Sequence, residues 1–225
     1  MKLENVTGDG AGPAKRWYDD ACGTAHALEL VGERWSLLIV RELMFGPRRF
    51  GELRAALPGI SANTLTQRLD GLAAAGIARR EKLPPPASVQ VYGLTPWGYE
   101  AEDAIQALGR WAARSPGHDP TLPISPASLM LSFRTMFRGS DGWRAAIGFR
   151  FDHEAFVVRV GGTLDVTRED PAAADVVLAA DPPMIAALVY GKVPLDQLPI
   201  AVTGSTDAAC RFVDLFALPP KAPRA

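Results

Sequence analysis

A short polar stretch carries the residue types that read DNA bases. Residues 58–69 read PGISANTLTQRL, and its polar side chains are mainly amides and hydroxyls. In a helix, Asn63 and Gln67 lie side by side, with Thr64 and Thr66 flanking them. Asparagine and glutamine bond adenine bidentately, and threonine bonds a base or contacts a thymine methyl group. These four residues are therefore candidates for base contacts in a DNA groove.

The same stretch has the pattern of a helix that is packed on one side. Leu65, Leu69 and Leu72 recur at helical spacing, opposite the amides, and form a seam that should be buried. Ser61 is a good N-cap residue, because its hydroxyl accepts a hydrogen bond from a backbone N–H of the first turn. Gly76 is a typical C-terminal glycine. We therefore expect a helix from Ser61 to about residue 75.

The neighbouring segments supply the elements that would position this helix. Apolar spacing and turn residues predict three helices before it and a hairpin with a proline-rich tip after it. The expected helices cover residues 22–31, 33–45 and 48–57, the strands cover 76–83 and 88–95, and a long helix covers 95–114. This order is that of a winged helix-turn-helix, whose recognition helix enters the major groove.

Local charge favours a polyanionic partner. The whole chain has a net charge of -1, but residues 41–82 hold eight cations and four acids, a surplus of four positive charges. Basic side chains position a protein on the phosphate backbone without reading sequence. The candidates for phosphate contacts are Arg48, Arg49, Ser61, Arg68, Arg79, Arg80 and Lys82. An ordinary solvated helix remains the alternative when spacing alone is considered.

Four ordered motifs resemble the HxlR-type, MarR-related winged-helix transcriptional regulators. They are CGTAHALELVGERWSLLIVREL, GPRRFGELRAALPGIS, LTQRLDGLAAAGIARR and VYGLTPWG, and the likeness spans about residues 18–114. It implies a cytoplasmic homodimer that binds double-stranded DNA. The implied dimer interface joins the N-terminal helix and helix 95–114 through Leu28, Ile105, Leu108 and Trp111. Gly23 stands where the family commonly has proline, and the triple proline of the wing is also unusual.

The remainder of the chain has a different pattern. Residues 115–126 are rich in proline and predict a linker, and residues 127–225 alternate short β-type runs with helices. We expect an α+β domain with a mostly antiparallel sheet. Its order of elements around DPPMIAALVYGK and VTGS resembles the sterol-carrier-protein-2 (SCP2) fold. That resemblance implies a hydrophobic cleft and a small hydrophobic effector.

The composition is that of a globular protein, with 48% hydrophobic and 22% charged residues among 225. The predicted divisions are a flexible N-terminus at 1–16, a DNA-binding and dimerisation domain at 17–114, the linker at 115–126 and the ligand-binding domain at 127–225. Neither a signal peptide nor a membrane span is predicted, so we expect a cytoplasmic protein with no membrane partner.

The two cysteines and three histidines make weak candidates for chemistry. Some proteins with this resemblance sense thiol chemistry through an N-terminal cysteine, which makes Cys22 a candidate redox sensor. The neighbouring Asp19 and Asp20 should raise the pKa of its thiol, and a packed interface cysteine is the alternative. Cys22 and His26 form only half a metal site, and Cys210 is expected in the core.

The sequence thus favours a DNA-binding regulator over two other classes of protein. No nucleophile elbow, phosphate loop or acid pair with a matched base is present, so neither an enzyme nor a cofactor is predicted. The alternative is a lipid or small-molecule carrier whose winged helix serves only in dimerisation.

Overall fold

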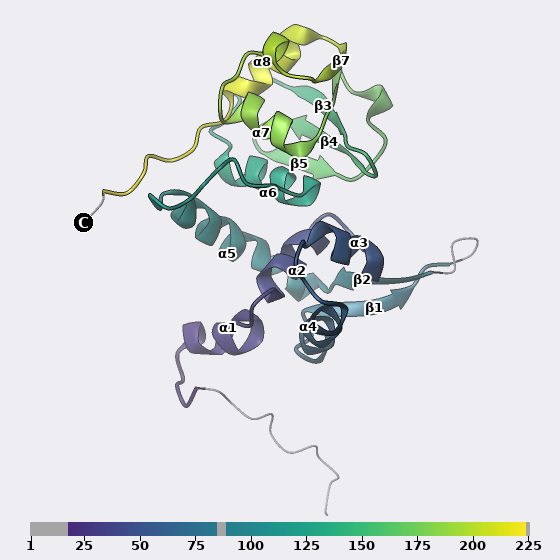
Figure 1. Ribbon diagram of the computed structural model, residues 1–225, viewed down its shortest axis with the longest axis vertical. Helices are drawn as coiled ribbons and strands as arrows, with labels where there is room; N and C mark the ends of the chain where they lie inside the picture. Colours follow the sequence, from purple (N-terminus) through teal and green to yellow (C-terminus); the bar gives the residue numbers. More distant parts are fainter. Residues whose placement is uncertain (1–17, 85–88, 224–225) are drawn as a thin grey trace, which may run out of the picture.

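The computed structural model describes residues 18–84 and 89–223, which form two α+β parts stacked along the long axis (Figure 1). The predicted flexible segment 1–16 and most of the proline-rich wing tip lie outside these residues. Every helix within them is too short or too polar to span a lipid bilayer.

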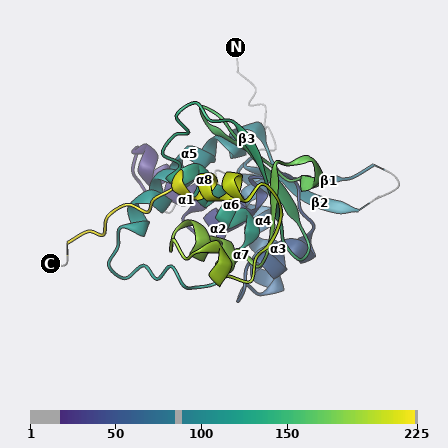
Figure 2. The ribbon, with the colours of Figure 1, turned by 90° about the horizontal axis from the view of Figure 1, so that it is seen from above.

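The N-terminal part is a winged helix-turn-helix, as the sequence predicts. Its elements are α1 (Gly23–Val31), α2 (Ser36–Leu43), α3 (Phe50–Ala56), α4 (Ala62–Ala74), β1 (Ala78–Lys82), β2 (Gln90–Leu94) and α5 (Pro96–Ala113). Strands β1 and β2 are antiparallel, and the hairpin projects from the body of the molecule (Figures 1 and 2). Arg48, just before α3, pairs through its backbone with Tyr92 and adds a third short segment to this wing.

The apolar seam of α4 is buried, and the helix packs against α2 and β1. Leu65, Leu69 and Leu72 are at most 1% exposed, and Ile39 and Leu43 of α2 are fully buried. Gly76 follows the helix at a φ of 72°, a left-handed conformation that glycine adopts without strain. The predicted helix, its buried seam and its terminating glycine are all confirmed.

Ser61 starts α4, and its removal gives a simple test of the local fold. Its hydroxyl accepts a 3.1 Å hydrogen bond from the backbone N–H of Thr64. Replacing it by alanine should lower the free energy of unfolding by about 1 kcal/mol, the typical contribution of an N-cap. Chemical denaturation measures this, with Ser205→Ala at the matched cap of the last helix as a second case. A loss well below half of that value for Ser61→Ala would contradict the capping role.

The C-terminal part is one five-stranded sheet covered by helices. Its main elements are α6 (Pro126–Met136), β3 (Ala145–Arg150), β4 (Ala155–Val160), β5 (Leu164–Thr167), β6 (Val176–Ala179), α7 (Pro182–Val189), β7 (Ala201–Gly204) and α8 (Thr206–Asp214). Two short 3-10 turns, η1 (Pro171–Ala173) and η2 (Leu195–Gln197), join them. The strand order is β5-β4-β3-β6-β7, and β3–β6 is parallel whereas the other pairs are antiparallel. The predicted mostly antiparallel α+β sheet is confirmed.

Aromatic side chains fill the space between this sheet and its helices. Phe133 of α6 lies 5.4 Å from Phe149 of β3, 5.4 Å from Phe212 of α8 and 5.0 Å from Phe216, measured between ring centroids. All four rings are at most 1% exposed. Helices α6 and α8 therefore cover the same face of the sheet and close its core.

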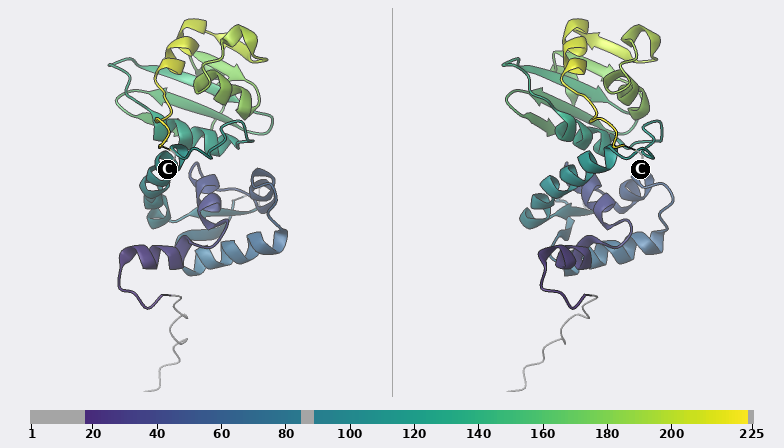
Figure 3. Two further views of the ribbon diagram at one scale, coloured as in Figure 1. Left: turned by 60° about the vertical axis from the view of Figure 1, so that its left-hand side comes forward. Right: turned by 90° about the vertical axis from the view of Figure 1, so that its left-hand side faces the viewer.

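The two parts meet where α5 of the first packs against α6 of the second (Figure 3). Residues 115–125, predicted as a linker, have no regular secondary structure but are held in place. The Lys221 ammonium donates to the carbonyls of Ala113, Ser115 and His118, each at 3.1 Å. The C-terminal tail thus returns to the end of α5 and holds the segment that connects the two parts in place.

Candidate nucleic-acid interface

Only two of the four predicted base-contacting side chains are unengaged. The Thr64 hydroxyl lies 2.8 Å from the Ser61 hydroxyl within the cap, and the Thr66 hydroxyl donates to the Ala62 carbonyl at 3.1 Å. Asn63 and Gln67 are exposed, and neither has a hydrogen-bond partner among residues 18–84 and 89–223. Their amides are therefore free to bond a ligand from the outer face of α4, whereas the threonines first stabilise the helix.

Most of the predicted phosphate-contacting cations are exposed, at the start of α3 and on the wing. The Arg49 side chain is 56% exposed and lies 3.9 Å from Glu52, and its backbone N–H bonds the same carboxylate at the start of α3. On the wing, Arg79 pairs with Glu81 at 3.3 Å, Arg80 bonds Gln90, and Lys82 is exposed. These surface pairs are weak, so phosphates can compete for the arginines.

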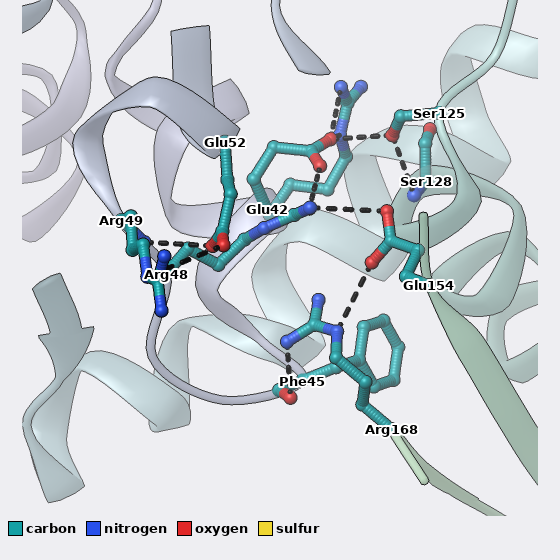
Figure 4. Close-up of polar contacts among 10 residues, drawn as sticks. Glu42, Phe45, Arg48, Arg49, Glu52, Ser125, Ser128, Glu154 and Arg168 are labelled. Carbon is teal, nitrogen blue, oxygen red and sulfur yellow. Dashed lines mark hydrogen bonds and ion pairs between the residues drawn. The ribbon is translucent and has the colours of Figure 1, made fainter. Parts of the chain in front are cut away.

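The assignment of Arg48 as a phosphate contact is wrong in this structure. Its side chain is 9% exposed, and its guanidinium bonds Glu42 at 3.3 Å and Glu154 at 3.1 Å (Figure 4). Burial between two carboxylates satisfies its charge inside the protein. Arg48 therefore connects the winged helix to the C-terminal part.

Arg68 also has an internal role that the sequence pattern does not reveal. Its guanidinium bonds the Glu33 carboxylate at 2.7 Å and the Arg34 carbonyl at 3.1 Å. These bonds tie α4 to the segment between α1 and α2. Arg34 itself is exposed, and its guanidinium lies 5.1 Å from the centre of the Trp35 ring.

Glu42 is the centre of a buried polar cluster at the junction. It is fully buried, and one carboxylate oxygen accepts from Arg41 at 2.9 and 3.1 Å and from the Ser125 hydroxyl at 2.6 Å. The other oxygen accepts from Arg48, which also reaches Glu154 of the C-terminal part. We call Arg41, Glu42, Arg48, Glu154 and Arg168 the junction cluster.

Arg168 completes the junction cluster from the C-terminal part. It bonds Glu154 at 3.1 Å and donates to the Phe45 carbonyl at 2.8 Å (Figure 4). Burial and the nearby Arg48 charge lower the pKa of Arg168, which Glu154 partly offsets. The cluster therefore holds the two parts together with charges that are largely removed from water.

The thiols differ from their predicted environments. Hydrogen bonds from the backbone and side chain of Thr24, and then from the Ala25 backbone, lower the pKa of the Cys22 thiol, so the expected upward shift is wrong. Cys22 is exposed at the start of α1, where N–H groups favour the thiolate. Cys210, expected in the core, is exposed on α8. Among the described residues, His, Cys, Asp and Glu side chains form no group of three that could hold a metal ion.

The predicted dimer-interface residues divide into two sets. Trp111 is 73% exposed and Leu28 is 50% exposed. Ile105 and Leu108 instead line a cavity within the chain, between α5, α2 and α6, although Leu108 is also 48% exposed. An exposed tryptophan and leucine on α5 and α1 leave apolar surface available to another protein.

Comparison with known proteins gives this site its context. The family of HxlR-like helix-turn-helix proteins matches residues 30–119. The HTH-type transcriptional regulator YodB of Bacillus subtilis is 37% identical over 86 residues, covering 38% of this chain and 77% of YodB. YvaP of the same organism is 34% identical over 86 residues, covering 38% of this chain and 80% of YvaP.

Other relatives are longer than the shared segment. The regulator sll1512 of Synechocystis is 40% identical over 87 residues, which cover 39% of this chain and 64% of that protein. The chain spans 53% of the length of its mycobacterial relatives. The family match covers the winged helix and ends at residue 119, so the likeness of residues 127–225 to the SCP2 fold stays a prediction. The similarity to YvaP and YodB covers more than two thirds of each, and on that basis the chain belongs to the HxlR-like helix-turn-helix family.

Proposed function

We propose that this protein is a sequence-specific, DNA-binding transcriptional regulator in which α4 enters the major groove. The observation that carries the proposal is the pair of exposed, unengaged amides on the outer face of α4, Asn63 and Gln67. Amide side chains at this position pair with adenine edges. YodB and YvaP, each similar to this chain over 86 residues, are named as HTH-type transcriptional regulators.

The protein is proposed to act as a homodimer on a pseudo-palindromic site. The exposed Trp111 and Leu28 support an interface made by α5 and α1. Two recognition helices would then occupy successive major grooves about one helical turn, roughly 34–36 Å, apart. A small hydrophobic effector is proposed to control this binding, with the SCP2-like part as the region that responds.

DNA selection followed by a salt titration tests the proposal. Fragments enriched by the purified full chain are expected to share a two-fold symmetric motif, and the dissociation constant should rise steeply with salt because counterions are released. Analytical ultracentrifugation of the complex reports two chains for each site. Selection that enriches no motif, together with binding that is insensitive to salt, would overturn the proposed function.

Arg49 is expected to contribute affinity without sequence preference. Arg49→Ala should reduce the affinities for operator and random DNA by similar factors. The slope of log affinity against log salt concentration should fall in magnitude by about 0.9 for each phosphate that is no longer neutralised. Fluorescence anisotropy at several salt concentrations measures the slope. Arg150→Ala is the matched control, because Arg150 is 54% exposed and pairs with Asp170 far from α4. Equal slopes for the two variants would show that Arg49 does not contact a DNA phosphate.

A further inference from the structure

An apolar cavity lies at the junction of the two parts of the molecule. It has a volume of about 420 Å³ and is bounded by α2, α5, α6 and the C-terminal tail. Its apolar walls include Leu37, Ile105, Leu108, Leu131, Met136 and Leu218. Its volume falls within the range of roughly 300–1,000 Å³ that is common for small-molecule sites.

The charged groups of this cavity have one sign. Among the described residues that line it, Arg41 carries a permanent positive charge, His118 is the one other titratable side chain, and none is an acid. Arg41 bonds Glu42 through Nε and Nη2, which leaves Nη1 without a hydrogen-bond partner in residues 18–84 and 89–223. A guanidinium N–H beside apolar walls is a suitable donor to an anion.

The cavity wall holds a second donor. Ser128 lines the cavity, and its backbone N–H bonds Ser125, whereas its hydroxyl has no partner among the described residues (Figure 4). The other two hydroxyls in the wall are engaged, since Ser132 bonds Tyr190 at 2.7 Å and Thr135 donates to a backbone carbonyl. The cavity therefore presents two free donors and no free carboxylate.

The surrounding charges also favour an anion. Arg41 and Ser128 also line a second cavity of about 730 Å³, whose wall includes every member of the junction cluster except the buried Glu42. That cluster has three arginines and two glutamates, and Nη2 of Arg168 is buried without a hydrogen-bond partner. Of the acids that line this second cavity, Glu154 is paired with arginines of the junction cluster and the others are exposed, as Asp152 illustrates with a side chain that is 81% exposed. Water screens such charges much more than it screens the buried arginines.

We infer that this cavity binds a small molecule with an apolar body and a single anionic head, a carboxylate or sulfonate. The head bonds Nη1 of Arg41 and the Ser128 hydroxyl, and the body lies against the leucines of α5 and α6. Arg41 also neutralises Glu42, whose other oxygen bonds Arg48 at the edge of the wing. Binding of a ligand in the cavity is thereby linked, through Glu42 and Arg48, to the winged helix that carries the DNA-binding surface. A regulatory role for the site rests on the proposed function, but binding itself does not.

Two fluorescent compounds that differ in the anionic head test the inference on the full chain. 8-Anilinonaphthalene-1-sulfonate has an apolar body with one sulfonate, and N-phenyl-1-naphthylamine is nearly the same body without it. The wild type is expected to bind the sulfonate more tightly. Arg41→Gln should weaken the binding of the sulfonate about tenfold or more, because it removes a charge-assisted hydrogen bond. It should change the affinity for the neutral compound little. Ser128→Ala should act in the same direction with a smaller factor.

Control variants separate the site from general effects. Arg54→Gln removes an exposed arginine that does not line the cavity and should leave both affinities unchanged. Gly109 lines the cavity, and a Cβ placed there meets nothing within 4 Å, so the helix can accept a side chain at this position. Gly109→Leu should therefore reduce the volume of the cavity and weaken the binding of both compounds. Gly71→Leu in α4 is the matched glycine outside the cavity and should weaken neither. Circular dichroism verifies folding.

The outcomes distinguish this inference from the proposed function. If Arg41→Gln and Arg54→Gln affect the sulfonate equally, or if Gly109→Leu leaves it bound, the site is refuted even when DNA binding is normal. If the site behaves as expected but the chain binds no DNA, the proposed function fails and the ligand site stands. Both are supported when the sulfonate shifts operator affinity by about fivefold or more in the wild type and not in Gly109→Leu.

Discussion

Replacing Glu42 by glutamine is expected to lower the free energy of unfolding by about 3–5 kcal/mol, the range for breaking a buried ion pair. Glu42 is fully buried and accepts hydrogen bonds from Arg41, Arg48 and Ser125. Glutamine keeps the shape but leaves the arginines of the junction cluster with one carboxylate instead of two. Urea denaturation followed by far-UV circular dichroism measures the loss.

Two comparisons make this prediction specific. Glu52→Gln removes a carboxylate that is 48% exposed and lies 3.9 Å from Arg49, so it should cost no more than about 1 kcal/mol. The double variant Glu42→Gln/Arg48→Gln removes the unbalanced charge with its partner and should recover part of the stability. Equal losses for Glu42→Gln and Glu52→Gln would show that the buried carboxylate contributes no more to stability than the exposed one.

The second large effect is expected on the DNA-binding face. Replacing both Asn63 and Gln67 by alanine should reduce operator affinity by about 2–6 kcal/mol, since each bidentate base contact contributes roughly 1–3 kcal/mol. Affinity for random DNA should change little, because the cations that contact phosphates remain. Both side chains are exposed and unengaged, so stability should change by about 0.5 kcal/mol or less.

Competition between labelled operator and random DNA measures this reduced preference. Gln106→Ala is the control, because that amide lies on α5 and bonds Glu102 rather than a ligand. A double variant that still prefers its operator by the wild-type ratio would exclude α4 amides as the source of specificity.

Local patterns predict the elements of this fold well. The expected helix after Ser61, its leucine seam and its end at Gly76 depend on caps, spacing and a glycine, which all act within a few residues. The short strands of the C-terminal part are likewise bounded by turn residues. The strand order, with β3 beside β6, comes from contacts between distant segments, so the sequence pattern predicts the type of sheet but not its order.

The candidate site is predicted less well because its charges act over long range. Arg48 looks like a surface cation next to Arg49, yet its partner Glu154 is 106 residues away. The direction of the Cys22 pKa shift depends on N–H groups at the start of α1, whereas the acids before it in the sequence suggest the opposite. The charge of a single residue does not show which distant residue it pairs with. The one local indication of the buried cluster is the acid Glu42 in the middle of the otherwise apolar helix α2.

The junction cluster also bears on how the protein can be divided for study. The matched family segment, residues 30–119, contains Glu42 and Arg48, but Ser125 and Glu154 lie beyond it. A fragment that ends after α5 would therefore keep Glu42 and Arg48. It would lack Ser125, which donates to Glu42, and Glu154, which accepts from Arg48. DNA affinities measured on such a fragment should therefore not be taken as those of the full chain, because Glu42 and Arg48 would each have lost a hydrogen-bond partner. The family match ends at residue 119, whereas hydrogen bonds of the junction cluster cross that boundary.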